Sequence, residues 1–166
     1  MRYENSGLTF NGIRIYWDGV DMQLSTHGKL FIQGYEKLFL AAYVGEDGIP
    51  TIGWGHTGPE VTRFSVCTIE QAEAWFDSDT ASAVNEVNET ILVTLTQDQF
   101  DALVSFTFNV GDHAEAKSTL VEFINEGDFT DAEAQFLRWD HVGKQVSGGL
   151  LARRKAEAAL FMTPAA

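Results

Sequence analysis

The sequence predicts a mainly helical α+β domain with one small sheet near its front. From Thr68 onward the pattern is helical almost to the end of the chain. Residues 39–58, by contrast, contain six Gly or Pro residues, which exclude a helix and favour short strands joined by tight turns. The length of 166 residues is that of one domain of ordinary size, with enough chain to bury a core.

The composition excludes several classes of function. A net charge of −13 disfavours nucleic-acid binding, which needs Lys and Arg, and it disfavours attraction to anionic membranes. No apolar run approaches the roughly 18 residues of a membrane span, so we expect no membrane insertion. The N-terminus shows no basic segment followed by an apolar one, so no secretory signal is expected. The single cysteine, Cys67, excludes an intrachain disulfide framework.

Residues 1–21 are expected to form an extension separate from a domain at residues 22–166. Two alternating segments flank Asn11-Gly12, a pair typical of the type I′ turn of a β-hairpin. A lone hairpin is marginal in water, so this one should pack on a larger body. A surface appendage is the favoured interpretation, and docking to a protein partner is the alternative.

The first helix is expected to start at Ser25 or Thr26, either of which can cap it, and to run to about Lys37. Glu36 then lies at its C-terminal end, where the negative end of the helix dipole disfavours ionisation of a carboxyl group. The apolar neighbours of Glu36 also favour the protonated form. Both effects suit a residue that acts as a proton donor.

Local signals also mark the later helices. Thr68 with Gln71 forms a capping box for a helix whose apolar face includes Ala72, Trp75 and Phe76. Thr96 with Gln99 forms a second capping box at the start of the next helix. The remaining signals, in chain order, are helix stops at Gly111 and Gly127, a cap at Thr130 with Glu133, and a break at Gly148-Gly149 before the last helix.

Two familiar site types are excluded. Residues 53–58 match G-x-G-x-x-G, but a dinucleotide site needs that motif between a strand and a helix, and here Pro59 follows with no second strand. None of the histidines stands in a zinc-binding spacing, and structural roles are expected for all of them: His27, His56, His113 and His141. We therefore expect no metal and no cofactor.

The carboxylates of the front region are the candidates for chemistry. Glycosidic cleavage needs an acid on one side of the bond and a carboxylate or a held water on the other. Glu36 is the candidate acid, Glu46 and Asp47 lie across the predicted hairpin, and the Thr51 hydroxyl is suited to holding a water. Judged by residue type alone, the same acids also fit ordinary turn and surface positions.

A longer pattern resembles the active-site signature of phage-type lysozymes, glycoside hydrolase family 24. That signature runs Glu, seven residues on Tyr, then Gly-x-x-Thr-Ile-Gly-x-Gly-His. Here it corresponds without a gap to Glu36, Tyr43 and Gly48-Ile49-Pro50-Thr51-Ile52-Gly53-Trp54-Gly55-His56. The resemblance spans roughly residues 22–162 and continues through Gln99-Phe100-Asp101-Ala102-Leu103, Phe108-Asn109-Val110-Gly111, Ser118-Thr119-Leu120, Trp139, Gly149-Leu150, Arg153-Arg154, Glu157 and Leu160-Phe161.

The resemblance implies a lysozyme-like fold and a set of roles. A small β-containing N-terminal lobe and a larger helical lobe would be joined by a long helix, with the glycan in a cleft between them. Glu36 would be the general acid, and Thr51 would help to place the attacking water. Arg153 would pair with Glu36, and His56 would brace the sheet, while Tyr43 belongs to the signature.

Two positions depart from the family pattern. Gly45 stands where the family usually has its second catalytic carboxylate, two residues after the Tyr. Asp47 can substitute, since alternation along a strand places it on the same side as position 45. Glu46 is nearer in sequence and is the second possibility, and no substitute at all is the third. Lys37 replaces a common Gly, and its ammonium would favour ionised Glu36 if the two lie close together.

The implied activity is that of a muramidase, which cleaves the β-1,4 bond between N-acetylmuramic acid and N-acetylglucosamine in bacterial peptidoglycan glycan strands. A phage enzyme of this kind would serve host lysis. It would wait in the host cytoplasm for a pore-forming partner or travel in the virion. The altered carboxylate leaves two alternatives open: a lytic transglycosylase that forms 1,6-anhydro products, and a relative that binds peptidoglycan without cutting it.

Overall fold

The computed structural model describes residues 9–10, 13–14, 21–45, 48–111 and 118–164. Its helices are α1 (Thr26–Gln33), α2 (Ile69–Thr90), α3 (Gln97–Val110), α5 (Thr119–Glu126), α6 (Phe129–Phe136) and α7 (Gly148–Phe161). Its antiparallel hairpins pair β1 (Thr9–Phe10) with β2 (Ile13–Arg14), β3 (Phe39–Val44) with β4 (Pro50–Gly53), and β5 (His141–Val142) with β6 (Gln145–Val146). The prediction of a mainly helical α+β chain is confirmed.

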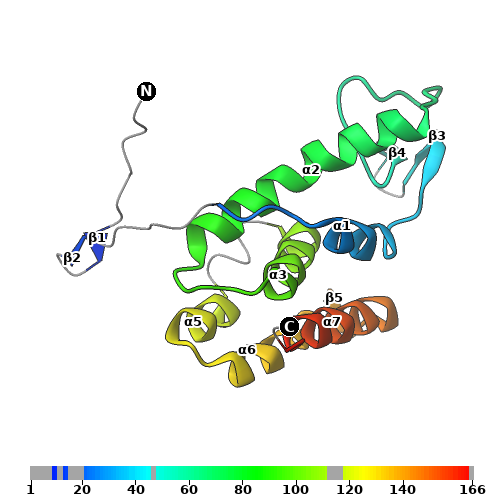
Figure 1. Ribbon diagram of the computed structural model, residues 1–166. Coiled ribbons are helices and arrows are strands. Elements are labelled where there is room, and N and C mark those ends of the chain that lie inside the picture. The colour runs from blue at the N-terminus through cyan, green and yellow to red at the C-terminus, as the bar shows by residue number, and fades with distance from the viewer. Residues whose placement is uncertain (1–8, 11–12, 15–20, 46–47, 112–117, 165–166) are drawn as a thin grey trace, which may run out of the picture.

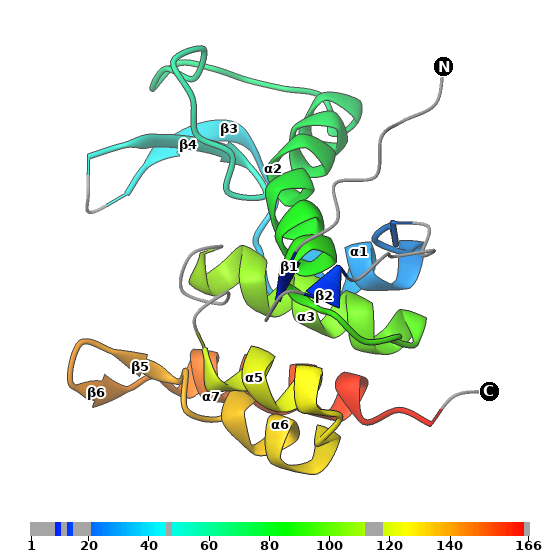
Figure 2. The ribbon, with the colours of Figure 1, turned by 90° about the vertical axis from the view of Figure 1, so that its left-hand side faces the viewer.

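The long helix α2 links a small β region to a larger helical one. The β3–β4 hairpin lies beside the N-terminal half of α2, while α5, α6 and α7 lie beyond α3 (Figures 1 and 2). Helix α3 packs against α1, α2 and α7 and so occupies the centre of the helical region. Most of the fully buried apolar side chains gather around it, and the largest of these are Ile32, Phe76, Phe100, Leu103, Phe106, Leu120, Ile124, Phe136 and Phe161.

The two predicted capping boxes are confirmed. At the start of α2 the Thr68 hydroxyl accepts a hydrogen bond from the Gln71 backbone N–H at 3.2 Å, and the Gln71 side chain accepts one from the Thr68 N–H at 2.8 Å. The same reciprocal pair, Thr96 with Gln99, opens α3. These bonds satisfy backbone donors that a helix N-terminus leaves free, which explains why both helices begin where the sequence indicates.

The predicted end of the first helix was wrong. Ser25 caps α1 as expected, but the helix ends at Gln33, and Gly34 is its C-cap residue. Gly is a poor helix former, and the next N–H, that of Tyr35, bonds the Ile32 carbonyl at 2.9 Å in a tighter turn. The chain therefore leaves the helix before Glu36 and enters β3 three residues later.

Two later helix starts also differ from prediction. Asp128, not Thr130, caps α6, since its carboxylate accepts from the Asp131 N–H at 3.1 Å. Gly127 has just ended α5 in the left-handed conformation, so the next helix starts at once. In α7 the cap is Ser147, and Gly148-Gly149 form the first helical turn instead of breaking the chain.

The front hairpin approaches α2 closely. Tyr43 pairs with Thr51 across β3 and β4, and Ile52 is fully buried. Gly53 has a φ of +64°, and a Cβ at this position would lie 3.4 Å from the Cβ of Ala72 on α2. The Cβ of any other residue would therefore be in ordinary van der Waals contact with the helix, but the positive φ would strain that residue.

The first two strands, β1 and β2, form an antiparallel pair on either side of the expected turn. Thr9 pairs with Arg14 and Phe10 pairs with Ile13, while the turn residues Asn11-Gly12 lie outside the described residues.

The Asn88 side chain of α2 clasps the backbone of Met22. It forms hydrogen bonds of 3.0 Å with both the N–H and the carbonyl of Met22. None of the helices in the described part of the chain is both long enough and apolar enough to cross a membrane.

Candidate active site

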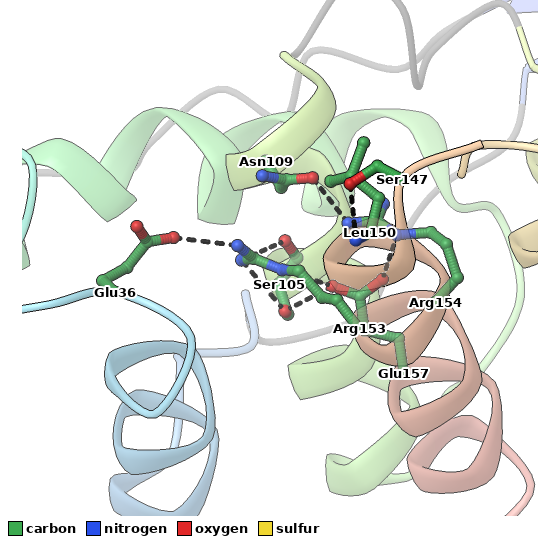
Figure 3. A network of polar contacts seen from close by, with 8 residues as sticks. All are labelled: Glu36, Ser105, Asn109, Ser147, Leu150, Arg153, Arg154 and Glu157. Atoms are coloured by element: carbon green, nitrogen blue, oxygen red, sulfur yellow. Dashed lines mark hydrogen bonds and ion pairs between the residues drawn. The ribbon is translucent and has the colours of Figure 1, made fainter. Parts of the chain in front are cut away.

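Glu36 lies in the short connection between α1 and β3, and its side chain faces the start of α7 (Figure 3). The Arg153 Nη1 donates a hydrogen bond to Glu36 Oε1 at 2.8 Å. The Arg153 side chain is only 5% exposed, whereas that of Glu36 is 25% exposed. One carboxyl group is therefore held by a buried cation on one side and open to solvent on the other.

The guanidinium of Arg153 is fixed by further contacts. Its Nε donates to Glu157 Oε1 at 3.0 Å, and its Nη2 donates to the Ser105 carbonyl at 3.2 Å. Glu157 Oε1 also accepts from the Ser105 hydroxyl at 2.7 Å. On its other side, Arg153 lies over the ring of Tyr35, 5.3 Å from the ring centroid. These contacts leave Arg153 little freedom to turn away from Glu36.

A second arginine completes what we call the α7 charge cluster: Ser105, Arg153, Arg154 and Glu157. Arg154 Nε lies 3.2 Å from Glu157 Oε2, and its Nη2 donates to the Asn109 side chain at 2.6 Å. Burial raises the pKa of Glu157, and the nearby arginines and Ser105 oppose that shift only in part. Burial likewise lowers the pKa of Arg154, against the attraction of Glu157.

Thr51 and Tyr43 face each other on the front hairpin. The Thr51 hydroxyl donates to the Ile49 carbonyl at 3.3 Å, and the side chain is partly buried. Tyr43 is 40% exposed, and its ring centroid lies 4.5 Å from that of Phe39. The structure thus puts both residues on the strand pair that follows Glu36.

The two acidic candidates, Glu46 and Asp47, lie outside the described residues, so their positions and roles stay predictions. The described residues on either side of them are joined by backbone hydrogen bonds from Gly48 N to the Gly45 carbonyl at 3.0 Å and from Gly45 N to the Ile49 carbonyl at 3.4 Å. Lys37 is exposed, and among the described residues Glu36 forms its ion pair with Arg153 and not with Lys37.

His56 connects the end of the hairpin to α2. Its Nδ1 lies 2.9 Å from Asp79 Oδ2, its Nε2 lies 2.8 Å from Glu60 Oε1, and its ring stacks on Trp75 at 4.7 Å. We call Glu60, His56 and Asp79 the His56 brace. Burial lowers the pKa of His56, but hydrogen bonds and charge from Glu60 and Asp79 outweigh that effect and raise the pKa above its ordinary value.

One group of side chains has the composition of a metal site. The ligand atoms of His27, Asp98 and Asp101 lie within 4.8 Å of one another. Asp101, however, is fully buried, and both of its oxygens already accept hydrogen bonds from Ser25, with a further one from Gln97 Nε2 at 2.9 Å. The carboxylate therefore ties the start of α1 to α3, which is a structural use.

Sequence reasoning assigned no role to several residues of these clusters. Glu157 stands four residues after Arg153 and three after Arg154, a spacing that places all three on neighbouring turns of one helix face and could have revealed the cluster. Asp79 is 23 residues from His56 and Ser105 is 48 from Arg153, so only the folded chain brings these pairs together.

Comparison with known proteins identifies the family. A profile of the phage lysozyme family, described as "Phage lysozyme", matches residues 33–157. The chain is 44% identical over 142 residues to the endolysin of Bacillus phage PZA, covering 84% of this chain but 55% of that protein. It therefore spans about half the length of that relative. Against the endolysin of Acyrthosiphon pisum secondary endosymbiont phage 1, identity is 42%, covering 84% of this chain and 98% of that protein.

A solved structure gives the same result in three dimensions. The muramidase domain of SpmX from Asticaccaulis excentricus is 36% identical and superposes with a TM-score of 0.79, covering 86% of this chain and 99% of that one. The lysozyme-like fold expected from the sequence is thereby confirmed. The chain belongs to the phage lysozyme family.

Proposed function

We propose that this protein is a muramidase that hydrolyses the β-1,4 bond between N-acetylmuramic acid and N-acetylglucosamine in bacterial peptidoglycan. The observation that carries the proposal is the setting of Glu36, a partly exposed carboxyl held at one oxygen by Arg153. The names of the relatives, endolysin and muramidase domain, agree with this activity.

The chemistry follows from what each group can do. Glu36 donates a proton to the oxygen of the leaving sugar, and Arg153 fixes the carboxyl in place. The described residues place no hydrogen bond on Glu36 Oε2, so this oxygen is available to the substrate. Thr51 on the hairpin helps to hold the attacking water. The positive charge that develops on the sugar is stabilised by a carboxylate, for which Asp47 and Glu46 are the candidates.

The wider setting of the enzyme is also part of this proposal. The substrate is the glycan strand of the bacterial cell wall, and the reaction serves host lysis, after release from the host cytoplasm or delivery with the virion. Residues 22–166 form the lysozyme domain, with Met22 clasped to α2 at its start. Residues 1–21 are proposed to be an N-terminal hairpin extension that serves as a surface appendage, with docking to a protein partner as the alternative.

Digestion of purified peptidoglycan by matched variants tests the activity. We expect Glu36→Gln to abolish cleavage, since the amide has no proton to give, while Glu126→Gln, an exposed residue of α5, cleaves like the wild type. One of Glu46→Gln and Asp47→Asn should be severely impaired. Fragment masses measure the outcome.

The same fragments decide between the proposal and its rivals. Hydrolysis leaves a reducing muramic acid end, whereas transglycosylation leaves a 1,6-anhydro end with no added water. Full-speed cleavage by Glu36→Gln would remove Glu36 from the mechanism, and an absence of cleavage by the wild type would leave a glycan-binding protein as the better description.

A further inference from the structure

Helix α7 carries more positive than negative charge next to the candidate acid, Glu36. Two arginines, Arg153 and Arg154, are buried within one turn of each other, and one buried carboxylate, that of Glu157, lies between them. Glu36 is the fourth charged group. With Glu36 ionised the four charges cancel, and with Glu36 protonated one positive charge is left over.

That imbalance matters because a proton donor must hold its proton while a cation touches it. A positive charge beside a carboxyl group favours the ionised form, and two favour it more. Coulomb interactions are strong where water is scarce, and Arg154 and Glu157 are both fully buried. The negative charge of Glu157 is therefore placed to offset one of the two arginines.

We propose that Glu157 is a positioning residue for the cleavage reaction, which holds the Arg153 guanidinium against Glu36 and cancels one of the two arginine charges behind the acid. The proposal rests on the proposed function of Glu36. Its geometric basis is a pair of hydrogen bonds that we call the relay (Figure 3). Arg153 Nε donates to Glu157 Oε1 at 3.0 Å, and Arg153 Nη1 donates to Glu36 Oε1 at 2.8 Å.

The elements packed around the relay contribute few other charges. Helix α3 faces it with the neutral groups Ser105 and Asn109. The connection that follows α1 contributes Tyr35, whose pKa is raised by burial and by the charge of Glu157. Helix α6 packs against α7 with the buried apolar residues Ala132 and Phe136. Glu157 is thus the one buried carboxylate of the described residues that bonds Arg153.

The test removes the negative charge of Glu157 while keeping the size and shape of the side chain. Glu157→Gln raises the net positive charge behind Glu36 by one unit, so Glu36 should lose its proton at lower pH. We expect the alkaline limb of the pH–activity profile to move down by about one pH unit, which is about a tenfold loss of rate on that limb. Glu157→Asp keeps the charge, so the alkaline limb of its pH–activity profile should lie at the wild-type position even if the variant is less stable.

A carboxyl titration by NMR separates this proposal from the activity itself. The 13C signal of Glu36, followed in wild type and Glu157→Gln, should titrate at lower pH in the variant whether or not either protein cleaves peptidoglycan. The proposal would be overturned if the Glu36 signal titrated at the same pH in the two proteins. It would also be overturned if Glu157→Asp moved the alkaline limb of the pH–activity profile as far as Glu157→Gln does. Failure of the wild type to cleave would instead count against the proposed function.

The wild-type protein supplies a check that does not depend on the variant folding. Glu157 can offset an arginine only while it is ionised, although its burial opposes ionisation. We expect the 13C signal of the Glu157 carboxyl to report the ionised form throughout the pH range of activity. A protonated Glu157 in that range would overturn the proposal even if Glu157→Gln could not be purified.

Discussion

The α7 charge cluster and the His56 brace differ most in their contact with water. In the α7 charge cluster, Arg154 and Glu157 are fully buried. In the His56 brace the imidazole is 10% exposed, but its partners Asp79 and Glu60 are 31% and 50% exposed. In the α7 charge cluster two arginines flank one carboxylate, whereas in the His56 brace one histidine lies between two carboxylates, and both clusters tie distant elements together. The buried cluster should resist changes of pH and salt, whereas the brace should respond to both.

The largest expected effect is the loss of a partner in the buried cluster. Arg154→Met leaves Glu157 buried with fewer partners and removes the hydrogen bond to Asn109. We expect the free energy of unfolding to fall by about 3–5 kcal/mol in urea denaturation. The control is Arg138→Met, an exposed arginine bonded to Gln135, which should cost less than about 0.5 kcal/mol. Equal small effects would show that burial does not distinguish the two arginines.

A smaller, pH-dependent effect is expected at the brace. The folded pKa of His56 is raised, so the stability it contributes is fully present below its unfolded pKa of about 6.5 and is lost as pH rises through the folded pKa. Asp79→Asn should therefore cost about 1–2 kcal/mol near pH 5 and less at higher pH. Thermal midpoints across the pH range measure this.

Asp77→Asn is the matched control on the same helix. Asp77 pairs with Lys29 at 2.6 Å, and lysine stays charged throughout that pH range, so the cost of this change should not vary with pH. A constant cost for Asp79→Asn as well would mean that the charge on His56 adds nothing to the brace.

The smallest effect is expected at the most exposed partner. Glu60→Gln should lower the thermal midpoint at about pH 5 by less than Asp79→Asn does, because half of the Glu60 side chain faces solvent. Added salt should remove most of the difference between Glu60→Gln and the wild type, through screening. A difference that persists in high salt would place Glu60 in a drier setting than its exposure indicates.

Much of the helical framework could be predicted from local signals. Thr68 and Thr96 start their helices because each stands three residues before a Gln that returns the bond, and such short-range pairs can be read from sequence. The start of α6 was missed because Asp128 and Thr130 are both good caps, and only the end of α5 at Gly127 decides between them. The β5–β6 hairpin was missed because its two-residue strands are too short for alternation to show.

The candidate site was predictable to a lesser degree. The apolar surroundings of Glu36 made it one candidate among several, and the family resemblance singled it out. Its pairing with Arg153 also came only from that resemblance, since 117 residues separate them. The replacement of the family's carboxylate at Gly45 stays a prediction, because Glu46 and Asp47 lie outside the described residues. Long-range partners such as Asp79 depend on how the helices pack, which no local spacing encodes.

The hydrogen bonds between the Met22 backbone and the Asn88 side chain have a practical consequence for attaching labels or tags to the protein. Asn88 lies two residues before the end of α2, whereas the front hairpin packs near Ala72 in the first turns of the same helix. A fluorescent label or affinity handle fused ahead of Met22 would thus be anchored more than twenty ångströms along the helix from the strands beside Glu36, at about 1.5 Å per residue. A protein tagged in this way should therefore keep the side of Glu36 that faces solvent free.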